Sequence, residues 1–300
     1  MRVVAEKGRC DSDHVSERPV RVIPAGHGRG ASPGARALFN RRTLARLTRV
    51  VTAVLVLAFF ATPVAAAYEE IAVPDGATVS GVVRFVGTPP RLEPIRVNKN
   101  REVCGTSKDS EALVVGPTGG VQGSVIRIEG IARGRKPDGE LLIDNHKCLF
   151  VPHVSALMAG TRARVRNSDP VLHNTHGFHT VGAGRQTVFN LALPSAGQVI
   201  DITRKLMKPG PVRVLCNAHP HMFAWVYVHT NPYVAISDAR GAYRIDGVPA
   251  GTYRVTMWHE GFRPTVVDKD GRPVYDEPRV TTKEVTVAPG ATATVDFELK

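Results

Sequence analysis

The stretch KPGPVRVLCNAHPHMFAWVYVH, residues 208–229, places a cysteine, two histidines and a methionine on a short loop between two apolar runs. The runs at 212–215 and 223–228 have the β-branched and aromatic composition of strands. In the second run, successive side chains are expected on opposite sides of a sheet. A thiolate, imidazoles and a thioether held between two strands form a metal-binding donor set. The stretch therefore predicts a β-sheet with a metal site at one end.

The rest of the chain after residue 68 also predicts strands. Short alternating runs bounded by Gly, Pro, Asn and Asp recur there, and no segment shows a sustained helical period. Between 161 and 166, arginines alternate with Thr, Ala and Val, so one face is expected to be buried and the other wet. The fold class is therefore predicted as all-β. The expected strands are 79–86, 123–128, 161–165, 187–193, 199–203, 212–215, 223–228, 242–245, 253–258 and 292–299.

A second group of metal donors lies upstream, in SDPVLHNTHGFH at 168–179. It follows the alternating strand directly, so a histidine there is expected at the rim of a sheet. Together, His173, Cys216, His219 and Met222 give a His₂Cys set with a weak thioether, which suits copper that changes between Cu(I) and Cu(II). Zinc usually takes a fourth strong ligand instead of methionine. We therefore expect copper as the cofactor.

Residues 121–229 resemble the cupredoxin family of small type 1 copper proteins, which includes plastocyanin and amicyanin. The matching features are LHNTH preceded by RARVRNSDP, the spacing Cys-x-x-His-x-x-Met, and KPGPVRVLC ahead of the cysteine. The short loop is most similar to that of amicyanin. The resemblance implies a Greek-key β-sandwich with one type 1 copper site held by the four donors above. It also implies that Asn174 hydrogen-bonds behind the ligands and ties the two ligand loops together.

Three further histidines depart from the family pattern. His221 stands where relatives usually carry a large apolar or aromatic residue, and His176 and His179 lie close to the first ligand. They are candidates for a secondary metal site, a proton relay or pairing with a partner's carboxylate. The alternative is that they are exposed loop side chains without such a role.

The resemblance also implies a route for electrons. His219, next to Pro220 on the short loop, is expected to be the solvent-facing edge of the site. Phe223 and Leu172 are expected to form a small apolar rim at which a redox protein docks.

The C-terminal part resembles the carboxypeptidase regulatory-like domain, a small prealbumin-like β-sandwich. The resemblance rests on the turn SDARG, the stretch GVPAGTY and the alternating ending VTVAPGATATVDFELK. The Gly-x-Val-x-Gly-x-Val strand that opens the family is missing after residue 229, but TVSGVVRFVG at 78–87 is similar to it. Either the cupredoxin is inserted into the C-terminal sandwich, or residues 70–120 add strands to the cupredoxin, and we prefer the second arrangement. The expected domains are a leader at 1–67, N-terminal strands at 68–120, the cupredoxin at 121–230 and the regulatory-like domain at 231–300.

The leader has the layout of a secretory signal. The apolar run TAVLVLAFF at 52–60 follows the basic NRRTLARLTR and precedes ATPVAAA, with cleavage expected near Ala66 or Ala67. The run is too short for a comfortable membrane span, so no stable membrane insertion is expected after cleavage. The twin arginines at 41 and 42 resemble a twin-arginine export signal. The protein is therefore expected to be periplasmic or secreted.

The charge of the chain is concentrated in this leader. The whole chain has 39 basic and 27 acidic residues, a net charge of +12. Residues 1–67 hold 11 of the basic and 4 of the acidic residues, so 28 and 23 remain, a net charge of +5. No nucleic-acid partner is expected, because most of the net positive charge is removed when the leader is cleaved.

Three cysteines follow the leader, an odd number for an oxidising compartment. Cys216 is the candidate ligand. Cys104 and Cys148 are either joined in a disulfide or separate buried thiols, and the sequence leaves both open.

These features predict an exported mononuclear copper protein that carries single electrons between larger redox proteins. An enzyme is not expected, because the sequence shows no nucleophile–base pair, paired carboxylates at a cleft or glycine-rich phosphate loop. One alternative is a periplasmic protein that stores or delivers copper without redox exchange. Another is a structural β-module that a metal stabilises.

Overall fold

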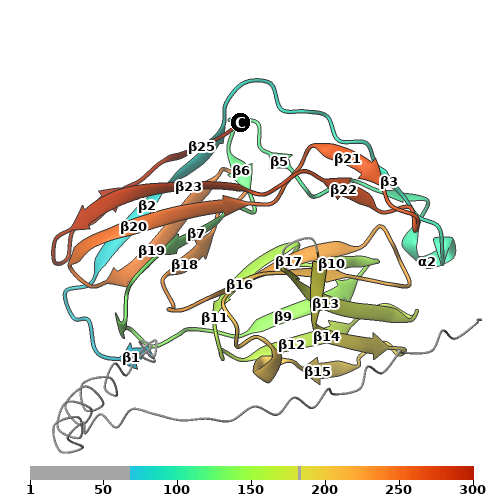
Figure 1. Cartoon of the computed structure of the whole chain (residues 1–300), viewed down its shortest axis with the longest axis horizontal. Helices are drawn as coiled ribbons and strands as arrows, with labels where there is room; N and C mark the ends of the chain where they lie inside the picture. Colours follow the sequence, from blue (N-terminus) through green and yellow to red (C-terminus); the bar gives the residue numbers. More distant parts are fainter. Residues whose placement is uncertain (1–67, 182–183) are drawn as a thin grey trace, which may run out of the picture. The chain divides into compact units, whose positions relative to one another are not determined.

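The computed structural model describes residues 68–181 and 184–300. Within these ranges strands dominate and form two β-sandwiches (Figure 1). Helical structure there is limited to α2 (Arg101–Cys104) and the 3₁₀ turn η1 (Thr203–Lys205). The all-β prediction is confirmed. The expected leader and its signal lie outside the described residues.

The described residues contain no helix that is both long enough and apolar enough to cross a bilayer.

The first sandwich carries the predicted metal donors. It packs a four-stranded sheet, in the order β10-β9-β12-β15, on a five-stranded sheet, in the order β11-β17-β16-β13-β14. Along β12, buried Ala163, Val165 and Asn167 alternate with half-buried arginines, as the sequence predicted. The strands are β9 (Leu141–His146), β10 (Leu149–Val151), β11 (Val154–Met158), β12 (Ala163–Asn167), β13 (His173–Val181), β14 (Gly184–Leu193), β15 (Val199–Asp201), β16 (Gly210–Leu215) and β17 (Phe223–His229).

The second sandwich is built from both ends of the described chain. One sheet has the order β18-β7-β20-β23, and the other has the order β19-β2-β24, with β25 also paired to β2. Val79 and Val83 of β2 are fully buried in the same core as Phe297 of β25. The strands are β2 (Ala77–Phe85), β7 (Val125–Ile128), β18 (Val234–Ile236), β19 (Ala242–Val248), β20 (Gly251–His259), β23 (Arg279–Val287), β24 (Thr292–Thr294) and β25 (Phe297–Leu299).

Strand pairing shows that the first sandwich is inserted into the second. β2 and β7 precede the first sandwich in the chain, yet Gly81 of β2 pairs with Tyr243, and Arg127 of β7 pairs with Val234. The preferred arrangement, in which residues 70–120 extend the cupredoxin, is therefore wrong for β2. The boundary expected at residue 121 lies too early, because β7 belongs to the second sandwich. An alternating apolar strand fits either core, so its sequence does not say which sheet it joins.

Short elements lie before β2, between β2 and β7, directly after β7 and after β20. Three two-stranded pairs combine these elements: β1 (Glu69–Glu70) with β8 (Arg133–Gly134), β3 (Ile95–Arg96) with β4 (Ser107–Lys108), and β5 (Val114–Val115) with β6 (Val121–Gln122). A fourth pair, β21 (Pro264–Val267) with β22 (Pro273–Tyr275), extends from the second sandwich (Figure 1).

We call residues 95–108, which contain β3, α2 and β4, the cover segment. A disulfide joins Cys104 in this segment to Cys148, in the turn between β9 and β10. The disulfide, which the sequence left open, attaches the cover segment to the first sandwich.

Strand β17 is buried on both faces. Ala224, Val226 and Val228 belong to the core of the first sandwich. On the opposite face, the Tyr227 ring lies 5.7 Å from the Trp258 ring of the second sandwich. The metal loop, residues 216–222, therefore leads into a strand of the first sandwich that also packs against the second sandwich.

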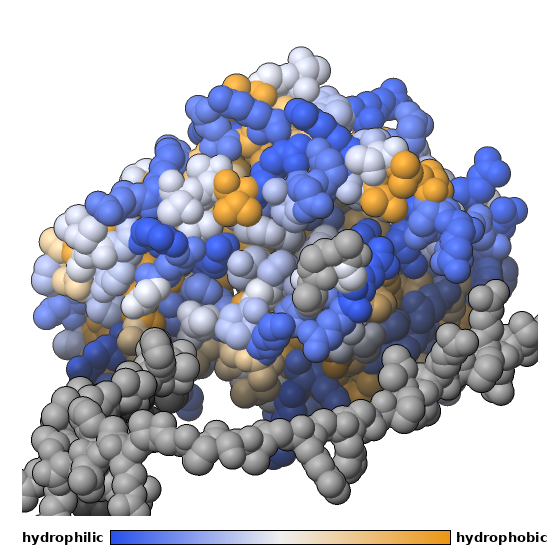
Figure 2. Space-filling view, in the orientation of Figure 1, coloured by the Kyte–Doolittle hydropathy of each residue, from blue (hydrophilic) through white to orange (hydrophobic). Residues whose placement is uncertain are grey.

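Most of the visible face of the described chain is hydrophilic, and its hydrophobic residues form separate small spots (Figure 2).

Candidate metal centre

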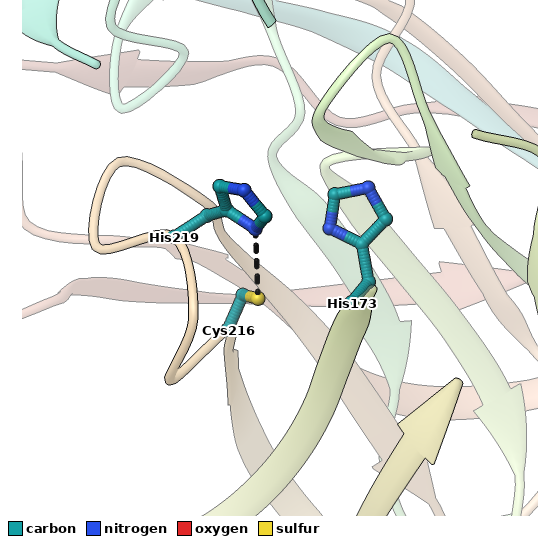
Figure 3. Close-up of side chains that lie close together, drawn as sticks. All are labelled: His173, Cys216 and His219. Atoms are coloured by element: carbon teal, nitrogen blue, oxygen red, sulfur yellow. Dashed lines mark hydrogen bonds between the residues drawn. The ribbon is translucent and has the colours of Figure 1, made fainter. Parts of the chain in front are cut away.

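Three of the predicted donors converge in the structure. His173 is the first residue of β13, Cys216 directly follows β16, and His219 lies on the loop before β17. Antiparallel pairing of β13 with β16 brings the start of one strand beside the end of the other. One ligand atom from each of the three residues lies within 4.8 Å of the others, and their side chains face a common space (Figure 3). All three residues are fully buried.

The turn that precedes His173 is fixed by hydrogen bonds. Asn167 Oδ1 accepts the N–H of Asp169 (2.9 Å), while Asn167 Nδ2 donates to the carbonyls of Val171 and Leu193 (both 2.9 Å). Asp169 Oδ2 in turn lies 2.9 Å from His173 Nε2. The asparagine at the end of β12 thus sets the position of the first histidine.

Both imidazoles are held through Nε2, which leaves Nδ1 for a metal. His219 Nε2 lies 3.0 Å from Asn100 Oδ1, and His219 Nδ1 lies 3.7 Å from Cys216 Sγ. His173 Nδ1 is buried and has no hydrogen-bond partner. A buried nitrogen without a partner is costly, and a metal ion would satisfy it. The donor set therefore fits a metal ion.

The protonation states also suit metal binding. Burial, followed by the neighbouring His173 and Lys99, lowers the pKa of His219 to about 4. Burial lowers the pKa of His173 despite its contact with Asp169. Both imidazoles are therefore neutral, the form that binds metals, at neutral pH. Burial raises the pKa of the Cys216 thiol, so a bound metal would be needed to hold it as a thiolate.

Met222 and Asn174, the other two residues predicted at the site, both make hydrogen bonds with residues of the metal loop. Met222 is fully buried in the same core as Cys216. The loop closes on itself, because the Cys216 N–H donates to the Met222 carbonyl (3.2 Å) and the Met222 N–H donates to the His219 carbonyl (2.9 Å). Asn174 donates its backbone N–H to Cys216 Sγ (3.4 Å), and its Oδ1 accepts the N–H of Asn217 (3.3 Å). Asn174 therefore connects β13 to the metal loop.

The structure does not bring the three additional histidines together. His176 Nε2 lies 3.1 Å from the Thr187 hydroxyl, whereas His179, two residues beyond the Gly177 bulge, lies against a backbone carbonyl of β16. His221 Nε2 lies 3.2 Å from the Cys148 carbonyl. Among the described residues, the cluster of His173, Cys216 and His219 includes none of these three.

Sequence reasoning missed Asp169 as a residue of this site. Its carboxylate accepts the backbone N–H groups of Lys147 and Cys148, both at 2.7 Å, and also contacts His173. The disulfide turn and the first histidine are thus connected through one buried carboxylate. The only signal in the sequence is that Asp169 stands four residues before His173.

Asn100 and its cover segment overturn the expected electron route. The Asn100 side chain lies over the outer nitrogen of His219, which is 0% exposed. Phe223 is also buried, at 5%, whereas Leu172 is 47% exposed. His219 is therefore not a solvent-facing edge, and Phe223 does not belong to an exposed docking rim. Asn100 is 119 residues from His219, and nothing in the sequence pattern connects the two.

Arg272 connects the second sandwich to both ends of the metal loop. It lies between β21 and β22 and is 5% exposed. Its Nη1 donates to the Met222 carbonyl (2.9 Å), and its Nη2 donates to the Cys216 carbonyl (3.0 Å). Burial, together with the nearby Arg213, lowers the pKa of Arg272 to about 10, so it stays charged at neutral pH. A positive charge is therefore held beside the predicted copper thiolate.

Comparison with known proteins finds a family match in the C-terminal part of the chain. Residues 219–300 match the family model of the carboxypeptidase regulatory-like domain. No curated protein matches the chain significantly.

Several solved structures of copper proteins match part of the chain. Amicyanin from Paracoccus versutus is 22% identical over 31% of this chain and 85% of its own, with a TM-score of 0.26. A purple cupredoxin from Nitrosopumilus maritimus is 22% identical over 31% of this chain and 100% of its own, with a TM-score of 0.26. A copper-containing nitrite reductase from Thermus scotoductus is 21% identical over 34% of this chain and 24% of its own, with a TM-score of 0.25.

The chain is thus an all-β protein that is similar to cupredoxin structures over about 31% of its length and matches the carboxypeptidase regulatory-like domain at its C-terminus.

Proposed function

We propose that this protein binds one copper ion through His173, Cys216 and His219, with Met222 as a weaker fourth ligand, and transfers single electrons between redox proteins. The observation that carries the proposal is the convergence of a buried thiol and two buried imidazoles, one with an unpartnered Nδ1. Copper supplies a one-electron change at such a site, and a His₂Cys set with a weak methionine is the ligand set of blue-copper proteins.

The surrounding residues keep the donors in place during electron transfer. Asp169 and Asn100 each contact the Nε2 atom of one imidazole, and Arg272 holds the carbonyls at both ends of the metal loop. A site with fixed donors needs little rearrangement when its charge changes. Burial of all three donors also keeps bulk water away from them.

Burial favours an electron carrier over the other functions. A metalloenzyme needs an open ligand position for its substrate, and a delivery protein must release its metal to an acceptor. Here the donors are buried beneath the cover segment, so an electron can reach them more readily than a substrate or a metal acceptor can. A metal that only stabilises a β-module would not need a redox-active ligand set.

We also propose that the protein acts outside the cytoplasm, in the periplasm or as a secreted protein. The Cys104–Cys148 disulfide supports this location, because disulfides persist mainly in oxidising compartments. The predicted secretory signal points the same way.

Spectroscopy of the Cu(II)-loaded protein tests the proposed function. We expect an intense blue thiolate-to-copper band and narrow copper hyperfine splitting in the electron paramagnetic resonance spectrum. Cys216→Ser should remove the band while the protein stays folded, whereas His176→Gln, in the same sandwich, should keep it. A pale protein with wide splitting would show that nitrogen and oxygen hold the copper, and the electron-carrier proposal would fail. If Met222→Ala changed stability but neither the spectrum nor the reduction potential, a structural metal would be favoured.

A further inference from the structure

A cleft lies between the outer face of the five-stranded sheet and the second sandwich. It has a volume of about 340 Å³, within the size range of small-molecule sites. Strands β13, β14, β16 and β17 provide one wall, and β22 with its flanking residues provides the other. The lining includes the side chains of Phe178, Arg185, Arg213, Trp225, Glu260 and Tyr275.

Arg213 presents an unpaired charge to this cleft. Its Nε atom is buried and has no hydrogen-bond partner, and within residues 68–181 and 184–300 its guanidinium forms no ion pair. Its Cζ atom lies 5.7 Å from the centre of the Trp225 ring. Burial and the nearby Arg185 lower its pKa. A guanidinium keeps its charge at neutral pH, and a partly desolvated charge without a partner is costly.

The carboxylates that line the same cleft have other partners. One Glu260 oxygen lies 2.5 Å from His153 Nε2, and the other accepts the Trp225 indole N–H at 2.8 Å. Asp276 pairs with Arg279 at 2.5 Å and accepts two backbone N–H groups. Neither carboxylate therefore forms a hydrogen bond or an ion pair with Arg213.

The charge at the cleft favours a singly charged anion. Arg185, whose Cζ lies 5.8 Å from the Phe178 ring, is a second cation without an ion pair among the described residues. Glu277, also in the lining, is an exposed acidic residue that would repel a multiply charged anion. Arg185, Arg213 and Glu277 together have a net charge of +1, which a ligand with one negative charge would neutralise.

We propose that this cleft binds a small aromatic monocarboxylate. Its carboxylate would accept two hydrogen bonds from Arg213, a geometry that matches the guanidinium fork. Its planar body would contact the rings of Trp225, Tyr275 and Phe178, which line the same space. This site is separate from the metal donors, although Arg213 stands three residues before Cys216 on the same strand and its connecting turn.

Calorimetric titration of the metal-free protein with benzoate tests the proposal. We expect saturable binding to one site. Binding should be at least about tenfold weaker for benzamide, which lacks the charge, and for acetate and inorganic phosphate, which lack the ring. Arg213→Gln should weaken benzoate binding at least about tenfold, whereas Arg204→Gln, an exposed arginine in η1, should not change it.

Each alternative result overturns the proposal. Benzoate that does not saturate, benzamide or phosphate that binds as tightly as benzoate, or an Arg213→Gln variant with unchanged affinity would each contradict it. The comparison of benzoate with benzamide needs only the unmodified protein, so it decides the charge requirement even if Arg213→Gln does not fold. Because no metal is present, the outcome is independent of the proposed copper function.

Discussion

Replacing Arg272 by methionine removes the two hydrogen bonds that connect the second sandwich to the metal loop. A hydrogen bond from a charged donor contributes about 1.5–3 kcal/mol, so the pair contributes about 3–6 kcal/mol. The substitution also relieves the cost of burying the guanidinium, and the Met222 carbonyl keeps its bond from the Cys216 N–H. We therefore expect the free energy of unfolding to fall by about 2–4 kcal/mol, mainly because the Cys216 carbonyl is left without a partner. Urea denaturation of the metal-free protein, with the disulfide intact, measures this change.

A matched arginine separates this effect from the loss of any arginine. Arg244 lies in the same sandwich, is exposed and pairs with Asp246, so Arg244→Met should change the unfolding free energy by less than about 1 kcal/mol. In the copper-loaded protein, Arg272→Met should lower the reduction potential, because a nearby positive charge favours the reduced site. Arg272→Lys keeps the positive charge, so its reduction potential should be close to that of the unmodified protein. The reasoning is refuted if Arg272→Met unfolds at the same urea concentration as Arg244→Met and has the potential of the unmodified protein.

Three further results are expected. As the pH falls from about 6.5 to about 4, the metal-free protein should become less stable. In the unfolded chain, His219 and His221 bind protons in this range, whereas in the folded protein both are buried, have a pKa of about 4 and stay neutral. Urea midpoints across this range should show the loss, His221→Gln should reduce it, and a flat profile would contradict it. Asn100→Ala should uncover His219 and speed electron exchange with a small inorganic oxidant in stopped-flow measurements; an unchanged rate would mean that electrons leave elsewhere. Replacing Cys104 and Cys148 by alanine should cost about 4 kcal/mol, since the disulfide closes a loop with a sequence separation of 44, and denaturation that matches the oxidised protein would exclude this contribution.

The sequence predicted the parts of the metal centre that depend on local spacing. Cys216, His219 and Met222 lie within one seven-residue loop, so the strands on either side are enough to place them together. His173 comes from a distant part of the chain, and the sequence did not predict that its strand pairs with the strand that ends before Cys216. The structure has that pairing, although LHNTH begins a strand and is not a loop at the rim.

The parts that sequence reasoning missed depend on packing between distant segments. Asn100 reaches His219 because the disulfide attaches the cover segment to the turn after β9. Arg272 reaches the metal loop because the β21–β22 hairpin extends from the other sandwich. Neither residue type is unusual in a turn, so no local pattern distinguishes it from an ordinary exposed residue. The same reason explains why His219 was expected at the surface.

The first sandwich is inserted between β7 and β18, which are neighbours in the second sandwich. It therefore forms a cassette, a segment that could be removed as a unit. The chain leaves the second sandwich after β7 and returns at β18, and these two strands are antiparallel neighbours with Arg127 opposite Val234. The entry and exit points of the cassette are therefore about 5 Å apart, the spacing of paired residues in an antiparallel sheet. A two-residue turn can span that gap, so the host sandwich has a direct way to close without its insert. Gain or loss of the whole first sandwich at this position would leave the strand order of the host unchanged.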